Sequence, residues 1–96
     1  MSVYSLTLEA DRDIAGIARE SVKTWGWDRA EAYVLDLHRA FDLLATFPDL
    51  GRSVGHIRRG HRRFERASHV IFYVRSDDGV LIIRVLHRRM EPRRHL

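Results

Sequence analysis

The spacing of apolar residues changes twice along this chain of 96 residues, and the two changes constrain the fold more than any other feature. Residues 3–8 alternate and are rich in residues that favour strands, which predicts a first strand. From Glu9 to Trp25 the apolar side chains instead recur at helical spacing. Acidic residues in the first turn suit the positive end of the helix dipole, and Gly26 ends the predicted helix.

A second helix is predicted directly after this glycine. Asp28 is the expected N-cap, Glu31 three residues later completes a capping box, and Trp27 precedes the cap as a hydrophobic staple. The apolar stripe of this helix comprises Ala30, Tyr33, Val34, Leu37, Phe41 and Leu44. Pro48 ends the helix near Phe47. Because only about three residues join the two helices, we expect them to lie antiparallel as a helical hairpin.

Three further strands are predicted after a turn-rich loop at residues 48–55. Their ranges are 61–66, 69–75 and 80–88. Residues 77–79, Asp-Asp-Gly, mark a hairpin between the last two strands. Residues 70–74 are apolar at every position, so this strand is expected at the centre of the sheet. The order β-α-α-β-β-β predicts one α+β domain over residues 1–96, with a helical hairpin packed on one face of a mostly antiparallel sheet. The other face is expected to be exposed or covered by something else.

The chain contains no cysteine, which excludes disulfides and thiolate zinc sites and favours a reducing compartment. Residues 1–5 lack the basic region and apolar stretch of a signal peptide. No apolar run approaches the roughly 20 residues that span a bilayer. We therefore expect a soluble cytoplasmic protein that does not bind membranes. The histidines are irregularly spaced and no carboxylate pattern accompanies them, so neither a metal nor a cofactor is expected.

The charges are distributed unevenly along the chain. Residues 1–50 carry five basic and nine acidic side chains, a net charge of −4, whereas residues 51–96 carry twelve basic and four acidic, a net charge of +8. Lys23 is the one lysine, so nearly all the basic groups are guanidiniums, which suit carboxylates and phosphates. Composition alone leaves three alternatives for the basic half: a nucleic-acid site, a site for an acidic protein segment, or a solvated basic surface.

The arginines form two strips in the predicted sheet. The first comprises Arg58, Arg59, Arg62, Arg63 and Arg66; the second comprises Arg84, Arg88 and Arg89, followed by Arg93, Arg94 and His95. In an antiparallel sheet the strips can converge, where they would serve RNA cleavage, phosphate-backbone binding, or capture of an acidic or amphipathic partner segment. Because the aromatic residues mostly occupy core-like positions, direct nucleic-acid binding is disfavoured.

Several of these residues also have plain structural interpretations. His87 follows a hydrophobic strand, and a simple strand-end position is favoured over a chemical role. Trp25 is expected in the core, whereas Trp27 is either a staple or an exposed anchor. Residues 90–96 are too short to carry a core, and form either a frayed tail or a docking segment.

Separated motifs along nearly the whole chain together resemble one family. They are Trp25-Gly26, residues 30–33, Phe47-Pro48-Asp49-Leu50-Gly51-Arg52, residues 57–64, residues 68–73, and residues 84–91. In register over the same order of elements, they resemble the ParE toxins of the RelE/ParE superfamily. The resemblance implies a toxin of a type II toxin–antitoxin system that assembles as a hetero-oligomer with a ParD-like antitoxin, whose C-terminal segment wraps it as a helix and an extended stretch. It also implies poisoning of DNA gyrase, growth arrest and no active-site chemistry.

The residues expected to bind the antitoxin or the target belong to the basic strips and the helix junction. They are Arg58, Arg59, Arg62, Arg63, Arg84, His87, Arg88, Arg89, Met90 and Trp27. The main alternative is a ribosome-dependent mRNA endonuclease of the RelE type, in which Arg63, Arg84 and His87 would be catalytic. The lysine and tyrosine usual in those nucleases are missing near the last strand, which disfavours this alternative. A third hypothesis, a basic adaptor without toxicity, predicts no effect on growth.

Overall fold

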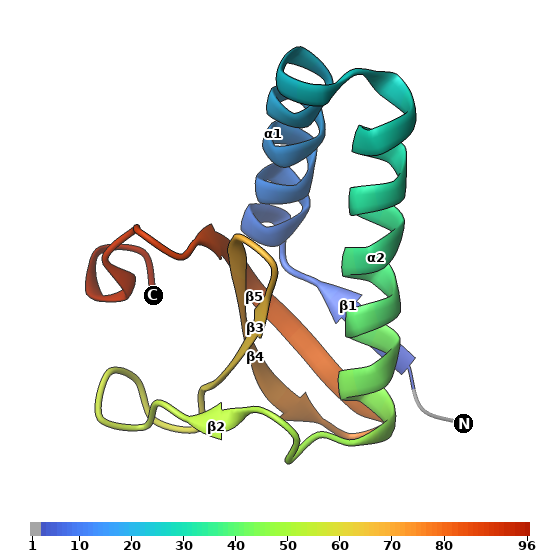
Figure 1. Ribbon diagram of the computed structural model, residues 1–96. Helices are drawn as coiled ribbons and strands as arrows, with labels where there is room; N and C mark the ends of the chain where they lie inside the picture. The colour runs from blue at the N-terminus through green and yellow to red at the C-terminus, as the bar shows by residue number, and fades with distance from the viewer. Residues whose placement is uncertain (1–2) are drawn as a thin grey trace.

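Two helices lie against a five-stranded sheet in the computed structural model, which describes residues 3–96 (Figure 1). The elements are β1 (Val3–Leu6), α1 (Leu8–Trp25), α2 (Trp27–Thr46), β2 (Arg52–Ser53), β3 (Arg62–Arg66), β4 (His69–Ser76), β5 (Gly79–His87) and a 3-10 helix (Pro92–Arg94). The predicted α+β class and helical hairpin are confirmed. The last three strands differ from their predicted ranges by no more than one residue at either end. The loop expected at residues 48–55 contains the short strand β2, which extends the sheet.

The strands lie in the order β1-β5-β4-β3-β2, so the apolar strand β4 is central, as predicted. All neighbouring pairs are antiparallel except β1 and β5, which are parallel. This parallel pair begins at Gly79, opposite Val3. A Cβ on Gly79 would lie 1.7 Å from the carbonyl oxygen of Val3, so only glycine permits the two backbones to approach this closely.

The two helices begin differently. The Thr7 side chain caps α1 by accepting a hydrogen bond from the amide of Ala10, and its hydroxyl donates to the carbonyl of Ile83 in β5. The predicted Asp28 cap of α2 is wrong: the helix already begins at Trp27, and Gly26 is its N-cap without a side-chain bond. Gly26 also ends α1, with φ of 87°, so one residue makes the whole turn and no position remains for a capping side chain.

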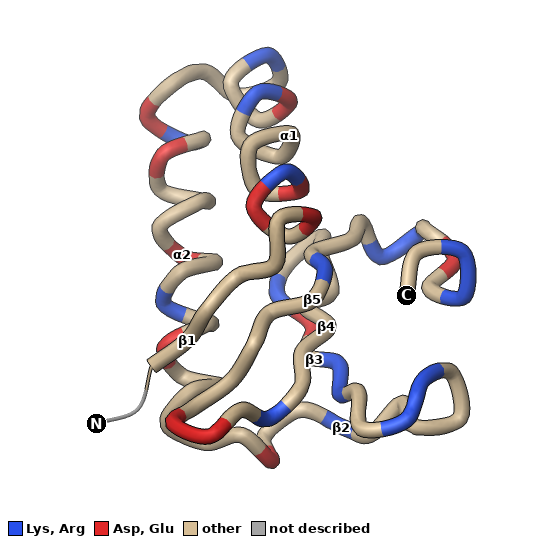
Figure 2. The backbone as a smooth tube through the Cα atoms, turned by 180° about the vertical axis from the view of Figure 1, so that it is seen from behind, with Lys and Arg blue, Asp and Glu red and all other residues tan. Residues whose placement is uncertain are grey.

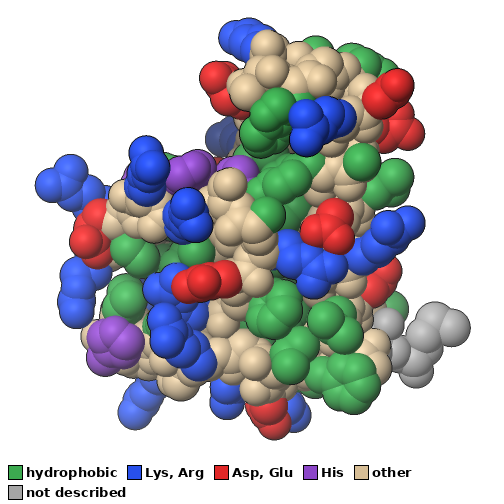
Figure 3. Space-filling view, in the orientation of Figure 1, with side chains coloured by type: hydrophobic (Ala, Val, Ile, Leu, Met, Phe, Trp, Pro, Cys, Tyr) green, Lys and Arg blue, Asp and Glu red, His purple; other side chains and the backbone are tan. Residues whose placement is uncertain are grey.

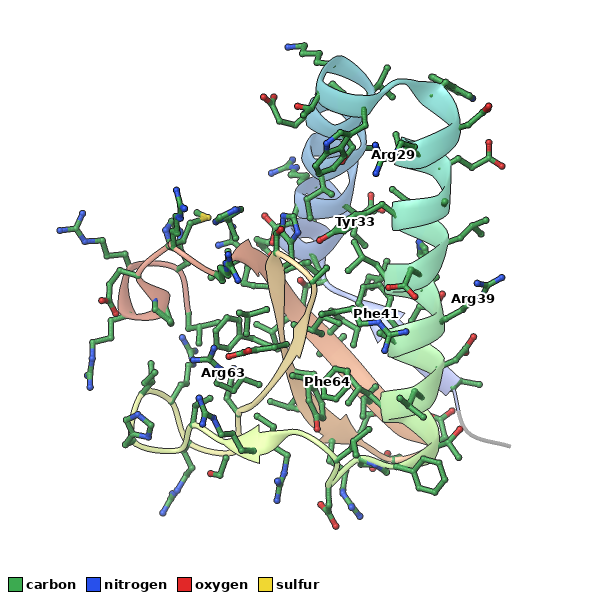
Figure 4. All side chains as sticks on the ribbon, in the orientation of Figure 1. Arg29, Tyr33, Arg39, Phe41, Arg63 and Phe64 are labelled. Atoms are coloured by element: carbon green, nitrogen blue, oxygen red, sulfur yellow. The ribbon has the colours of Figure 1, made fainter. Side chains whose placement is uncertain are left out.

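The main core lies between the helices and the sheet. Its buried members include Leu37, Phe41 and Leu44 from α2, Ala10 and Ile14 from α1, and Ile71, Tyr73, Val80, Ile82 and Val85 from the sheet. Tyr33 and Phe41 project from α2 toward the strands, whereas Arg39 points away from them (Figure 4). The hydroxyl of Tyr73 donates to the carbonyl of Pro48 at 2.7 Å and accepts from the amide of Gly51, so it joins the end of α2 to the sheet.

The opposite face of the sheet is partly covered by a second, smaller apolar cluster. Val70, Phe72 and Leu86 from the strands pack there with Val54, and Ile57 and Leu96 lie against them. The covering groups come from the loop after β2 and from the end of the chain. The C-terminal segment is therefore a docking segment, and it docks on the chain's own sheet.

The hairpin extends past the edge of the sheet (Figure 1). Both tryptophans lie at its far end, because α1 ends at Trp25 and α2 begins at Trp27. The prediction that Trp25 is in the core is wrong: 46% of its surface is exposed, because no strand lies beneath that end of α1. Trp27 is 70% exposed, which fits an exposed anchor better than a staple. Within residues 3–96, no helix is long and apolar enough to cross a membrane.

Candidate partner-binding site

A groove of about 670 Å³ lies between α1 and α2 near their connection. We call it the hairpin groove; it is lined by Ala18, Arg19, Val22, Lys23, Trp27, Ala30, Glu31, Val34 and Leu35. The small side chains of Ala18 and Ala30 create the hollow between the helices, and the larger apolar side chains form its walls. Basic residues of α1 and Glu31 of α2 border it on opposite sides. Such a concave apolar surface with a charged rim suits an amphipathic partner helix.

A second groove, of about 590 Å³, lies between α1 and the C-terminal end of β5. We call it the strand-end groove; its lining includes Arg12, Glu20, Trp25, His69, His87 and Met90. Figure 3 shows histidine side chains at the foot of the projecting hairpin. The strand β1 pairs with β5 only as far as Ile82, so beyond that residue this edge of β5 faces the groove. Because the Ile83 carbonyl and the Val85 amide are bound by Thr7 and Asp13, the groove offers only the last residues of this strand edge, together with side chains.

A polar cluster forms one wall of the strand-end groove. The hydroxyl of Tyr33 lies 2.6 Å from Nδ1 of His69, and the rings of His69 and His87 meet edge to face at 5.5 Å. Burial lowers the pKa of His69, and repulsion from His87 lowers it further. The lowered pKa favours neutral His69, and its hydrogen bond with the hydroxyl of Tyr33 ties the start of β4 to α2.

The arginines of β3 are largely engaged within the fold. Arg62 donates to the carbonyl of Gly51 at 2.6 Å, and Arg63 pairs with Glu65 at 2.9 Å. Arg66 binds both carboxylate oxygens of Asp36 at 2.9 Å. The latter hydrogen bonds lower the pKa of Asp36. Within the first predicted strip, Arg62 and Arg66 thus fasten β3 to its surroundings, whereas Arg63 pairs within the strand.

Arg84 is also occupied. Its Nε and Nη2 donate to the two oxygens of Asp13 at 2.8 and 2.9 Å, and its Nη1 donates to the carbonyl of His95 at 3.1 Å. Asp13 additionally accepts from the amide of Val85. The hydrogen bonds that Arg84 donates to Asp13 raise the pKa of Arg84 above its usual range. Arg84 therefore joins α1, β5 and the C-terminal segment.

The two predicted strips do meet. Arg63 pairs in register with Phe72, which pairs in register with Arg84, so the two arginines flank one aromatic residue across the sheet. The guanidinium of Arg63 lies 6.0 Å from the centre of the Phe72 ring. Because Arg84 is turned toward Asp13 and the C-terminal segment, this meeting point does not present two free guanidiniums.

The remaining predicted residues either line one of the two grooves or are exposed arginines. Trp27 lines the hairpin groove, whereas His87 and Met90 line the strand-end groove. Arg58, Arg59, Arg88 and Arg89 are exposed. The sequence motifs do not mark Asp13, Tyr33, His69 or Leu35 as candidate site residues. Asp13 is 71 residues from Arg84, and no local pattern pairs them. Among residues 3–96, no three His, Cys, Asp or Glu side chains are grouped to hold a metal ion.

Comparison with known proteins decides the family. The family described as "ParE toxin of type II toxin-antitoxin system, parDE" matches residues 4–92. The chain belongs to the ParE toxin family. It is 36% identical over 96 residues to Toxin ParE1 of Mycobacterium tuberculosis, covering 99% of this chain and 98% of that protein. It is 38% identical to Toxin ParE1 of Caulobacter vibrioides, covering 100% and 99%.

More distant ParE proteins agree. The chain is 27% identical over 92 residues to Toxin ParE of Escherichia coli, covering 95% of this chain and 89% of that protein. A solved structure of the chromosomal ParDE system from P. aeruginosa has the same fold, with a TM-score of 0.76 at 20% identity, over 91% of this chain and 96% of that one. The predicted resemblance is thus confirmed: this is a ParE-type toxin of a toxin–antitoxin system.

Proposed function

We propose that this ParE-type toxin acts in the cytoplasm, is neutralised by a ParD-like antitoxin, and blocks replication by poisoning DNA gyrase without catalysing a reaction itself. The observation that carries the antitoxin part is the hairpin groove, an exposed apolar hollow beside two exposed tryptophans. Exposed apolar surface of this kind marks a protein interaction site. The gyrase part rests on the ParE family membership.

The two grooves suit the two parts of an antitoxin segment. The hairpin groove has the apolar floor and charged borders that an amphipathic helix fills. The strand-end groove adjoins the edge of β5 beyond Ile82, where an extended stretch can lie along the strand. Because α1 lines both grooves, one continuous segment can occupy them in succession.

The arrangement of charged groups supports action by binding. A nuclease of the RelE type would need Arg63, Arg84 and His87 free to hold the scissile phosphate and to move protons. Here Arg84 is bound by Asp13, and Arg63 is bound by Glu65. The ring of His87 packs edge to face against the ring of His69, and His69 is itself hydrogen-bonded to Tyr33.

A pair of variants tests the antitoxin site. Leu35→Glu places a charge in the hairpin groove, whereas Leu43→Glu places one at an exposed position of the same helix outside that groove. We expect Leu35→Glu to weaken binding of the antitoxin at least about tenfold, since a buried unpaired charge is costly, and Leu43→Glu to leave the affinity nearly unchanged. Calorimetric titration with the purified antitoxin measures both; equal affinities would refute the groove as the site.

Supercoiling by purified gyrase tests the target. Added toxin is expected to inhibit supercoiling and to leave cleaved DNA, and added antitoxin is expected to relieve both effects. Unimpaired supercoiling by a toxin that still binds its antitoxin would remove gyrase as the target. Messenger RNA that is cleaved on expression of the toxin, but stays intact with His87→Ala, would establish the nuclease alternative instead.

A further inference from the structure

Six arginines with exposed side chains occupy the part of the molecule formed by the loop between β2 and β3 and the chain after β5. We call this the tail-side basic face; its members are Arg58, Arg59, Arg88, Arg89, Arg93 and Arg94. Within residues 3–96, none of the six forms an ion pair with an Asp or Glu side chain, in contrast to Arg62, Arg63, Arg66 and Arg84. The two segments contain a single acidic residue, Glu91.

The fold holds these two segments together. Arg58 donates through Nη1 to the carbonyl of Leu96 at 2.8 Å, and Ile57 and Leu96 pack on the same apolar cluster. The bond from Arg58 is one clamp on the C-terminal segment, and the bond from Arg84 to the carbonyl of His95 is the second. Figure 2 shows the loop and the C-terminal segment extending on the same side of the sheet, both marked with basic residues. The six charges are therefore part of a folded surface rather than of a loose tail.

This face lacks the features of a protein interface. Such interfaces have an apolar centre with few charges, and the exposed large apolar side chains of the described chain lie mainly elsewhere. They are Trp25, Trp27 and Leu35 on the hairpin, Leu43, Phe47 and Leu50 at the end of α2 and the following turn, and Val3 and Leu8 near β1. Only Met90, 39% exposed, adjoins the basic face.

The face suits a phosphate backbone. Backbone contacts require exposed guanidiniums and no apolar centre. Recognition of single-stranded bases requires exposed aromatic side chains, and the aromatic residue beneath this face, Phe72, is buried. The core-like aromatics that disfavour base recognition thus leave backbone binding to a duplex open. Among nucleic acids, this combination favours double-stranded DNA bound without sequence preference.

We propose that the tail-side basic face binds the phosphodiester backbone of duplex DNA, so that the toxin contacts DNA directly. The proposal does not depend on which enzyme the toxin poisons. Direct contact would raise the local concentration of toxin along DNA, where a DNA-handling target works. The antitoxin grooves and this face are lined by different residues apart from their common neighbour Met90.

Fluorescence anisotropy of a labelled duplex of about 20 base pairs tests the proposal with purified toxin. We expect micromolar affinity that falls steeply with salt, at about 0.9 logarithmic units per logarithmic unit of salt for each phosphate neutralised. The triple variant Arg59→Ala, Arg93→Ala, Arg94→Ala leaves the two clamps intact and should reduce the salt slope by about 2 to 3. Its affinity at low salt should fall at least about tenfold.

A matched triple variant separates a local site from net charge. Arg29→Ala, Arg39→Ala, Arg75→Ala removes the same charge from exposed positions outside the basic face and both grooves, and should change DNA affinity by less than about twofold. Equal losses in the two triple variants would overturn the proposal, as would no loss in either. Arg88→Ala, Arg89→Ala provides a second variant of the face if the first fails to fold, as judged by circular dichroism.

Two further measurements distinguish other ligands. Tighter binding to single-stranded RNA of equal charge than to duplex DNA would overturn the assignment to DNA. An affinity for the antitoxin that falls with Arg59→Ala, Arg93→Ala, Arg94→Ala, while DNA affinity stays unchanged, would make the face a protein interface. Inhibition of gyrase is scored separately, so failure of DNA binding leaves the proposed target untouched.

Discussion

The two faces of the sheet are covered in different ways. On one face, two long helices bury a broad apolar core that includes Leu37, Phe41 and Tyr73. On the other, a loop and a short terminal segment cover a small cluster around Phe72. The first face is closed by apolar packing along whole helices. The second is closed by Val54, Ile57 and Leu96, and two arginines hold the terminal segment by its backbone oxygens. The difference indicates that the helix-covered face provides most of the stability, while the tail-covered face is free to carry charge.

The largest expected effect comes from truncating one phenylalanine on each face. Phe41→Ala should lower the free energy of unfolding by about 4 kcal/mol, because the helices and strands around it cannot close the cavity. Phe72→Ala should cost about 3 kcal/mol, at the lower end for a buried phenylalanine, because a loop and a terminal segment can move to fill the space. Urea unfolding measures both; equal losses would mean that the two faces are equally rigid.

The next effect concerns two bidentate ion pairs that differ in burial. The side chains of Asp13 and Arg84 are 15% and 20% exposed, whereas those of Asp36 and Arg66 are 41% and 31% exposed. Asp13→Asn should cost about 3 kcal/mol, because it leaves a largely buried guanidinium without its partner. Asp36→Asn should cost less than about 1 kcal/mol, since water screens that pair. Unfolding curves in which Asp36→Asn is the more damaging would contradict this interpretation of burial.

The sequence specified the order of the elements because each depends on local spacing. Alternation in residues 3–8, helical periodicity up to Trp25 and an unbroken apolar run at residues 70–74 each predicted an element that the structure contains. The position of Trp25 was predicted wrongly because its burial depends on how far the sheet extends beneath the helix. The cap of α2 was predicted wrongly because Gly26 makes the entire turn.

The candidate site was less predictable than the fold. The basic strips and Trp27 could be identified from the sequence. The sequence does not reveal, however, which arginines are paired within the fold and which are free. Arg84 meets Asp13 only because α1 passes the end of β5, and Arg58 meets Leu96 only because the terminal segment turns back. Contacts between residues far apart in sequence leave no local pattern, so the division between clamping and free arginines required the structure.

A smaller effect is expected from the terminal segment. Leu96→Ala should lower the free energy of unfolding by about 1 kcal/mol, because the side chain only partly covers the cluster around Phe72. Amide hydrogen exchange should speed up in the C-terminal segment and in the loop after β2, and stay slow in α2. Leu50→Ala, at an exposed position away from the cluster, is the control. Faster exchange in α2 with Leu96→Ala would show that the two faces unfold together.

The smallest effect is a pH dependence confined to the helix-covered face. Burial and the neighbouring His87 hold the pKa of His69 below its usual 6.5, and Asp13 opposes them only in part. As pH falls through about 6.5, His69 becomes protonated in the unfolded chain but remains neutral in the folded one. The free energy of unfolding therefore decreases until the pH reaches the lower folded pKa. Above pH 7 the group contributes no pH dependence.

Urea unfolding at pH 7 and pH 5 measures this loss, and His69→Gln should abolish it while leaving an acceptor for the hydroxyl of Tyr33. His56→Gln, at an exposed position in the loop after β2, is the control and should keep the pH dependence. The pKa of Asp36 is lowered from 3.8, so the stability that its ionised form contributes is lost only in more acidic solution, outside this window. A loss between pH 7 and pH 5 that persists in His69→Gln would place the titrating group elsewhere and remove the helix-covered face as its origin.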